Sequence, residues 1–283
     1  LTIEDGYAIN MVPLATFAME TYADDDCRIF APHVEENRPD LNEKTLRLIA
    51  QMHKAITIIG FKLEGAMCKA HPQWGMEHRC ILEHINKAEG TITLDGVTYP
   101  LIDSNFPTLD EHDPYALTPE EADLMERLRH SFMRSERLQA HVNCLLMRGG
   151  MYMIYNSNLM FHAAVPINED GSMREVVFDG VPVKGKELMK KVERMARTAF
   201  DSDVDEATRE KYADFFWYLW CGPESPLFGK AKMATFERYL LDDKEVQKEP
   251  KGWYYILRDN AEVCDYILDE FGVKGNHRHI ING

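Results

Sequence analysis

One histidine of this sequence stands where a side chain could take part in chemistry. The stretch NSNLMFHAAVP, from Asn156 to Pro166, is mostly apolar up to His162 and continues with Ala163 and Ala164. A residue at the end of a strand is fixed by the sheet and still reachable by a ligand, and two alanines leave room for a metal or substrate to approach. The same pattern fits a core histidine that hydrogen-bonds a backbone carbonyl, and by itself it favours this second interpretation.

A second group of residues could bind an anion. Lys230, Lys232 and Arg238 follow a loop rich in glycine and proline, whose backbone amides could help to hold a phosphate group. A basic loop in an acidic chain favours ligand binding, whereas the residue types are equally typical of a solvated surface loop. The pattern leaves both interpretations open. The residues that punctuate this loop are Gly222, Pro223, Pro226 and Gly229.

The other reactive side chains are predicted to have structural roles. Cys221 has no recognisable base partner and is expected to be an unreactive thiol. His130 and His141 share one face of a predicted helix, but no acidic residue completes a metal-binding motif beside them. His279, which follows His277 near the end of the sequence, could reach the rim of the site, but a structural role is favoured for both.

The first half of the chain is predicted to be mostly helical. Apolar residues three and four apart predict a long amphipathic helix over residues 41–69, and residues 76–87 also have a helical pattern. Residues 118–121, TPEE, are typical of a helix N-terminus. This helix is predicted to continue without a break to Gly149-Gly150.

Short strands are predicted in the second half, because aromatic and aliphatic residues occur there in short runs broken by Asn and Ser. Asp-Gly pairs at 95–96 and 179–180 predict tight hairpins. Strands are also predicted within 151–162 and in the final RHIING, and helices over 185–200, 206–220 and 259–270. Helices around a few short strands predict an α/β or α+β fold, with a helical insertion inside a sheet-based domain.

The composition excludes several classes of function. Lys and Arg number 32 against 47 Asp and Glu, so the formal net charge of −15 disfavours binding to nucleic acid or to an anionic membrane surface. No apolar run approaches the roughly 20 residues of a membrane span. The six cysteines show no CxxC spacing, which is typical of reduced thiols in a cytoplasmic protein.

Several stretches resemble one known family. LMFHAAVPINEDG, which contains His162, is similar to the histidine turn of calcineurin-like metallophosphoesterases. Four separated blocks, in the same order along the chain, resemble the class III, Firmicutes-type fructose-1,6-bisphosphatases of that superfamily. The blocks are FKLEGAMCKAHPQWGMEHR, DSNFPTLDEHDPYALTPEE, WYLWCGPESPLFGKAKMATFERYLLDDKE and EFGVKGNHRHIING.

The resemblance implies hydrolysis of the 1-phosphate of fructose 1,6-bisphosphate, a step of gluconeogenesis, at a two-metal centre with manganese as the metal. It implies that His162 is a metal ligand, since such centres combine imidazole with hard oxygen ligands. A bisphosphate also needs cations for the phosphate that is not cleaved, and Lys230, Lys232 and Arg238 are the candidates. The implied partner is a small sugar bisphosphate.

The sequence also departs from the family pattern. The signatures GDxxDRG and GNHD, which supply most metal ligands in the family, do not occur in it, and Ala163-Ala164 replace the usual Gly-Cys. One histidine cannot hold two metals, so we expect an internal fragment that is inactive by itself. Residues 1–150 are expected to form a helical insertion or cap, and residues 151–283 part of the metallophosphoesterase core, with strands at 151–166 and 277–283 and further helical insertion between.

The sequence leaves two alternative functions open. The first is a non-catalytic module, derived from this family, that binds an anionic metabolite or mediates assembly. The second is a protein phosphatase that shares the histidine turn, which the tryptophan-rich block disfavours. The sequence leaves the oligomeric state open, a homo-oligomer included.

Overall fold

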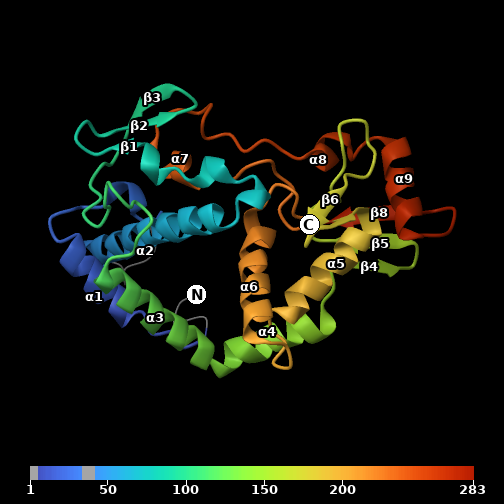
Figure 1. Cartoon of the computed structure of the whole chain (residues 1–283), viewed down its shortest axis with the longest axis horizontal. Helices are drawn as coiled ribbons and strands as arrows, with labels where there is room; N and C mark the ends of the chain where they lie inside the picture. The colour runs from blue at the N-terminus through green and yellow to red at the C-terminus, as the bar shows by residue number, and fades with distance from the viewer. Residues whose placement is uncertain (1–5, 34–41) are drawn as a thin grey trace. The chain divides into compact units, whose positions relative to one another are not determined.

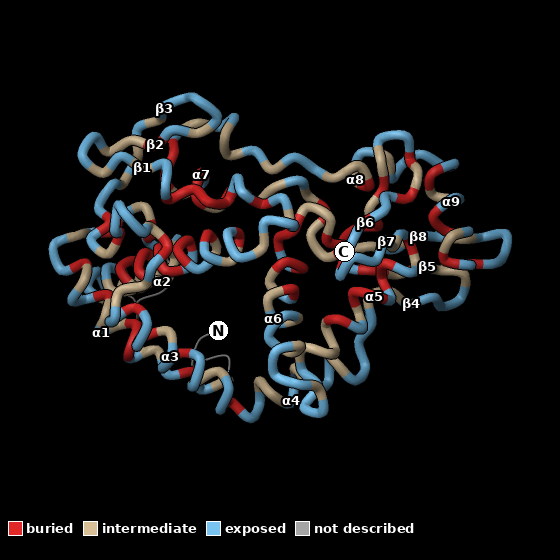
Figure 2. The backbone as a smooth tube through the Cα atoms, in the orientation of Figure 1, coloured by how far each residue is buried: buried red, intermediate tan, exposed pale blue. Residues whose placement is uncertain are grey.

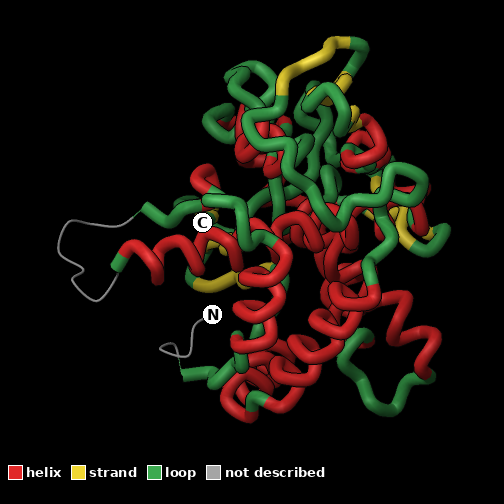
Figure 3. The backbone as a smooth tube through the Cα atoms, turned by 90° about the vertical axis from the view of Figure 1, so that its left-hand side faces the viewer, coloured by secondary structure: helices red, strands yellow, loops and turns green. Residues whose placement is uncertain are grey.

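The computed structural model describes residues 6–33 and 42–283, which form two compact units. Unit 1 comprises Leu1–Val142 and Ala234–Gln247, and unit 2 comprises Asn143–Met233 and Lys248–Gly283. Helices predominate and the strands are short (Figure 3). The mixed helix-and-strand fold predicted from the sequence is therefore confirmed at that level.

Unit 1 is built on one long helix, α2, against which α1 packs (Figure 1). A small antiparallel sheet in the order β1-β2-β3 completes the unit, and its β2–β3 turn is the predicted hairpin, with φ of 50° at Asp95 and 80° at Gly96. The elements are α1 Val12–Thr21, α2 Glu43–Ala70, β1 Ile85–Asn86, β2 Thr91–Leu94, β3 Val97–Pro100, α3 Pro119–Arg134, the first turns of α4 Glu136–Arg148, and α7 Thr235–Leu240.

The buried face of α2 differs from the predicted one. The helix itself is confirmed, and its N-cap Asn42 accepts a hydrogen bond from the Thr45 amide. However, Leu63, one of the apolar residues at helical spacing, is 40% exposed, while Lys54 and Lys62 are fully buried. Figure 2 shows buried and exposed segments alternating along α2. An amphipathic pattern read from apolar residues alone misplaced this face, because two lysines belong to it.

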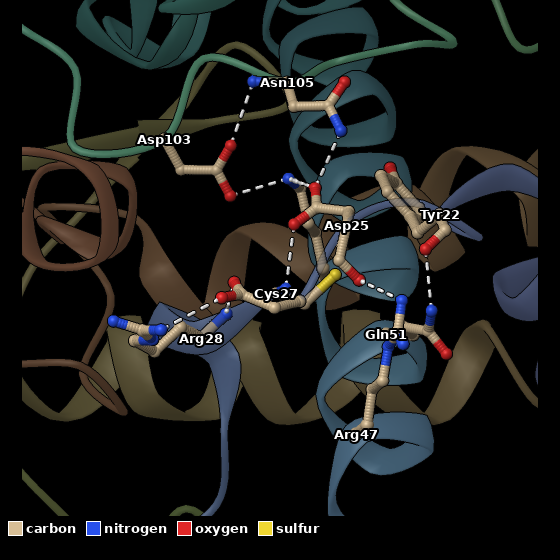
Figure 4. Close-up of polar contacts among 10 residues, drawn as sticks. Tyr22, Asp25, Cys27, Arg28, Arg47, Gln51, Asp103 and Asn105 are labelled. Atoms are coloured by element: carbon tan, nitrogen blue, oxygen red, sulfur yellow. Dashed lines mark hydrogen bonds and ion pairs between the residues drawn. The ribbon is translucent and has the colours of Figure 1, made fainter. Parts of the chain in front are cut away.

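The Lys54 ammonium is neutralised by carboxylates from two loops. Its Nζ lies 2.6 Å from Asp25 Oδ2 and 2.6 Å from Asp103 Oδ2. The Asn105 side chain donates to Asp25 Oδ2 at 2.8 Å, and the Cys27 amide donates to Asp25 Oδ1 at 2.8 Å, so these loops converge beside α2 (Figure 4). A buried cation needs such partners, because an unpaired buried charge lowers the folding stability by on the order of several kcal/mol.

Lys62 connects α2 to the start of α3. Its Nζ donates to Glu121 Oε2 and to the Thr108 carbonyl, both at 2.7 Å. Glu121 is also the third residue of the predicted capping box, since its carboxylate accepts from the Thr118 amide while the Thr118 hydroxyl accepts from the Glu121 amide. One carboxylate therefore caps a helix and neutralises a buried lysine.

The predicted continuous helix to Gly149 is wrong, because it breaks at Ser135. The backbone of Ser135 is extended, with φ −72° and ψ 97°. Its hydroxyl donates to the Tyr7 carbonyl at 2.5 Å and accepts from the Leu138 amide at 3.4 Å. A contact with a residue far away in the sequence thus separates α3 from α4.

The helix predicted over residues 76–87 is also wrong. This region consists of short 3₁₀ turns, Glu77–Arg79 and Leu82–His84, followed by β1. Arg79 is only 6% exposed, and its Nε donates to Glu64 Oε1 of α2 at 3.0 Å. Tertiary pairing with α2 overrides the local helical pattern.

Unit 2 contains a sheet in the order β4-β5-β8, where β4 and β5 are antiparallel and β5 and β8 are parallel. The predicted second hairpin is confirmed as β6–β7, as are the strands within 151–162, the final strand and the three predicted helices. The elements are β4 Tyr152–Tyr155, β5 Asn158–Phe161, β6 Val176–Phe178, β7 Val181–Val183, α5 Gly185–Thr198, α6 Glu206–Cys221, α8 Trp253–Leu257, α9 Ala261–Phe271 and β8 His279–Asn282.

Apolar side chains of these elements form the core of unit 2, with Leu159 of β5, Ile267 and Phe271 of α9 fully buried in it. None of the helices described is long and apolar enough to cross a membrane.

Two glycines of α2 provide a matched test of its packing. A Cβ at the buried Gly65 would lie 2.0 Å from Tyr115 Cε1, whereas one at the exposed Gly60 would meet nothing within 4 Å. We expect Gly65→Ala to lower the free energy of unfolding by about 1–3 kcal/mol through overpacking. Gly60→Ala should raise it by about 0.5–1 kcal/mol, since alanine favours helix. Urea denaturation checks both, and equal effects would contradict this packing.

Replacing Lys54 should destabilise unit 1, because two partly buried carboxylates, Asp25 and Asp103, lose the fully buried cation that they share. We expect Lys54→Met to lower the free energy of unfolding at pH 7 by about 3–5 kcal/mol in urea denaturation. The exposed Lys44 lies on the same helix, and Lys44→Met should change it by less than about 0.5 kcal/mol.

This loss should shrink in acid. Burial raises the pKa of Asp25, but hydrogen bonds from Lys54, the Cys27 amide and Asn105 outweigh it and hold the pKa below its usual value. A carboxylate with a lowered pKa contributes stability above its unfolded pKa and loses it as the pH falls through its folded pKa. Wild type and Lys54→Met should therefore converge below about pH 4. A difference that stays constant as the pH falls well below about 4 would contradict the pairing.

Candidate functional site

His162 lies where the sequence analysis predicted, immediately after β5. Leu159 and Phe161 of β5 are buried, and the alternation of a strand then leaves His162 exposed. The parallel partner β8 ends beside it, with Phe161 opposite Asn282 and the Gly283 amide donating to the His162 carbonyl at 2.9 Å. Among the described residues the imidazole has no hydrogen-bond partner, so the interpretation as a buried, satisfied core histidine is wrong.

The turn after His162 is held tightly. Ala163 and Ala164 are both buried, and the Ala164 amide donates to the Pro226 carbonyl at 3.1 Å. The Asn282 side chain donates to the Ala163 carbonyl at 3.4 Å and accepts from the Tyr254 hydroxyl at 3.1 Å. Room for a ligand exists beside Ala164, which lines a cavity.

This cavity has a volume of about 240 Å³ and is lined by residues 164–167, by the loop around Ser225 and by residues 251–254. Two basic side chains line it. Arg174 forms an ion pair with Glu224, whereas Lys251 is exposed and has no ion pair within the described part of the chain. Trp253 contributes an aromatic wall. The arrangement could hold a small anion whose organic part lies against the indole.

The three predicted phosphate-binding residues are placed differently from one another. Lys230 Nζ lies 2.5 Å from Glu249 Oε2, a carboxylate that is only 6% exposed. Lys232 is half-buried in the same unit. Arg238 belongs to α7 of unit 1, where its Nε donates to the Gln247 carbonyl at 3.4 Å. Lys230 is thus engaged by the protein itself, and the binding roles of all three stay predictions.

The loop that precedes Lys230 does not offer an anion cradle. Its amides already donate within the protein: Gly222 to the Tyr218 carbonyl at 2.6 Å, and Ser225 to the Gly222 carbonyl at 3.0 Å. The Leu227 amide donates to the Ser225 hydroxyl at 3.1 Å. Cys221, at the end of α6, is buried, and its thiol donates to the Trp217 carbonyl at 3.6 Å.

The described residues do not form a two-metal centre by themselves. Between residues 6–33 and 42–283, no three His, Cys, Asp or Glu side chains are grouped so that they could hold a metal ion. His279 begins β8 opposite Asn158, at the other end of the parallel strand pair from His162. His162 fits a metal site only as one ligand among others that the described residues do not supply.

Sequence reasoning missed Arg174, Lys251 and Trp253 as cavity residues. A weak signal existed in the tripeptide Lys251-Gly252-Trp253, where a cation and an aromatic ring flank a glycine. The Gly252 amide donates to the Gly229 carbonyl at 2.9 Å, and glycine suits this close approach because a Cβ there would lie 3.1 Å from that oxygen.

Comparison with known proteins gives a single family. Residues 1–283 match the family described as Firmicute fructose-1,6-bisphosphatase. The chain is 55% identical, over its whole length, to a protein of Bacteroides thetaiotaomicron named fructose-1,6-bisphosphatase class 3. Proteins of the same name from Parabacteroides distasonis and Clostridium botulinum are 51% and 49% identical, again over the whole chain.

The chain spans only 42% of the length of each of these three relatives. No solved structure matches it.

The ion pair of Lys230 gives a prediction that separates a structural role from a substrate-binding role. Lys230→Met removes the cation beside a buried carboxylate, so we expect the free energy of unfolding to fall by about 1–2 kcal/mol. Lys251→Met removes the same charge from an exposed position and should cost less than about 0.5 kcal/mol. Thermal and urea unfolding measure both; equal stabilities would show that the Lys230 pair contributes nothing.

Proposed function

The chain belongs to the Firmicute fructose-1,6-bisphosphatase family, and on that premise we propose that the full-length protein hydrolyses fructose 1,6-bisphosphate to fructose 6-phosphate and inorganic phosphate. The observation that carries the proposal is the match across all 283 residues, at 55% identity to a relative of that name. Because the chain spans 42% of that relative, the activity is assigned to the full-length protein.

His162 is proposed as one metal ligand of that full-length enzyme. Its support is positional: an exposed imidazole without a hydrogen-bond partner among the described residues, at the carboxyl end of β5 and beside the end of β8. Carboxylates and further imidazoles from other parts of the full-length protein would complete the site. Manganese accepts such mixed nitrogen and oxygen ligands and is the proposed metal.

The cavity beside Ala164 is proposed to hold the phosphate group that is not cleaved. Lys251 supplies a cation without a competing carboxylate in the described structure, and Arg174 supplies a second one that Glu224 partly neutralises. Lys232 and Arg238 remain candidates for further phosphate contacts, whereas Lys230 would first have to leave Glu249. Neutralising cations are needed because the chain as a whole is strongly acidic.

We further propose the architecture and the compartment. Residues 1–150 would be a helical insertion, and residues 151–283 part of a calcineurin-like sandwich with the β4-β5-β8 sheet at its core. A reducing, cytoplasmic location is supported by the six cysteines, none of which forms a disulfide in the described part of the chain.

The proposal is tested by phosphate release from fructose 1,6-bisphosphate by the purified full-length protein, with and without manganese. We expect release that depends on manganese. A phosphopeptide serves as the comparison substrate. Faster cleavage of the phosphopeptide would favour a protein phosphatase, and no release from either substrate would favour a non-catalytic module.

The role of His162 has a readout that does not depend on activity. We expect His162→Ala in the full-length protein to weaken the affinity for manganese by at least about tenfold. The manganese content of the protein after dialysis at limiting metal measures this loss. His279→Ala removes an exposed imidazole from the opposite end of the same strand pair and should leave the manganese content unchanged. Equal manganese binding by both variants would remove His162 from the ligand set.

A further inference from the structure

Unit 1 contains a second cavity, which the proposed reaction does not use. It has a volume of about 760 Å³ and lies between the segment Gly6–Pro13 and the junction of α3 with α4. This volume is in the range of cavities that hold small molecules. The lining of this cavity includes Tyr7, Pro13, Arg127, His130, Arg134 and Arg137.

Hydrogen bonds fix the walls of this cavity. The Asn10 amide donates to the Ser131 hydroxyl at 2.8 Å, and the Ser135 hydroxyl donates to the Tyr7 carbonyl at 2.5 Å. The Tyr7 hydroxyl lies 2.8 Å from His141 Nδ1 of α4. The chain before α1 is therefore attached to both helices, and the cavity is a preformed feature of the fold.

Basic side chains gather on one side of the cavity for two reasons. Arg127, His130 and Arg134 are spaced three and four residues apart and so share one face of α3. The break at Ser135 then turns the chain, so that Arg137 from the first turn of α4 lines the same space. In an uninterrupted helix Arg137 would continue the row along α3. The break instead places its guanidinium carbon 6.0 Å from the centre of the Tyr7 ring.

The acidic residues nearby cancel only part of this charge. Glu126 lines the cavity, but both of its oxygens accept from Arg129, at 2.9 and 2.8 Å, and Arg129 is not part of the lining. Asp123 contacts Arg127 at 3.5 Å in a mostly exposed pair. Glu136 is the second carboxylate of the lining. Arg134 and Arg137 have no ion pair among the described residues.

We propose that this cavity binds the phosphate group of a small phosphorylated metabolite, with Arg134 and Arg137 as its principal contacts. Guanidinium groups stay protonated and form paired hydrogen bonds to phosphate oxygens. Tyr7 and Pro13 provide an apolar surface for the organic part of the ligand. Nucleic acid is disfavoured as the ligand, because the chain as a whole carries a net charge of −15. The site belongs to the unit that does not contain His162, and it does not rest on the proposed reaction.

The test measures binding of inorganic phosphate to the full-length protein by isothermal titration calorimetry. The protein is first freed of metal with a chelator, so that phosphate held by a metal centre does not contribute. We expect Arg134→Gln with Arg137→Gln to weaken phosphate binding at least tenfold, and Arg127→Gln alone to weaken it less. Arg148→Gln removes an exposed arginine from the last turn of α4, outside the cavity, and should leave the affinity unchanged.

Each outcome decides the proposal. Absence of phosphate binding by the wild type would overturn it, as would equal affinities of the wild type and the double variant. An equal loss in Arg148→Gln would show general charge attraction in place of a site. Circular dichroism and thermal unfolding of every variant verify the fold. Repeating the titrations in a Lys251→Met background, where the cavity beside Ala164 has lost its lysine, separates this cavity from the proposed substrate-phosphate site.

Discussion

The two buried lysines of α2 are the constraint on which unit 1 depends. A fully buried ammonium group is tolerated only when oxygens surround it. Here those oxygens come from three segments outside α2: Asp25, the segment from Asp103 to Thr108, and Glu121. Each of them fixes the segment to which it belongs. Because Glu121 is also the cap of α3, the same constraint sets where α3 starts and which of its faces bears Arg127 and Arg134.

Local chemistry made much of this fold predictable from the sequence. Hairpins at Asp95-Gly96 and Asp179-Gly180 and the helix N-terminus at Thr118 all form where expected, because each depends on a few adjacent residues. The errors have the opposite origin. The break at Ser135 depends on a carbonyl 128 positions away, and the buried lysines and Arg79 belong to pairs that no periodicity can reveal.

The candidate site was predictable to the same extent. The position of His162 follows from a strand, an exposed alternation and a turn, all of them local. The ion pair of Lys230 does not follow from local sequence, because Glu249 lies 19 residues further along. A short antiparallel bridge between Lys230 and Lys251 brings the two segments together. That bridge also explains why Lys251 was overlooked: its place beside the cavity depends on pairing between two loops.

The acidic composition of the chain makes a cation without an ion pair a candidate for ligand binding. With 47 acidic residues against 32 basic ones, a lysine or arginine that serves only the fold has carboxylates available in excess. Lys54, Lys62 and Lys230 follow that rule, each within 2.7 Å of a carboxylate oxygen. Lys251, Arg134 and Arg137 line cavities without such a partner in the described structure. In a chain so rich in carboxylates, a cation kept apart from them at a cavity wall remains available to an anion from solution.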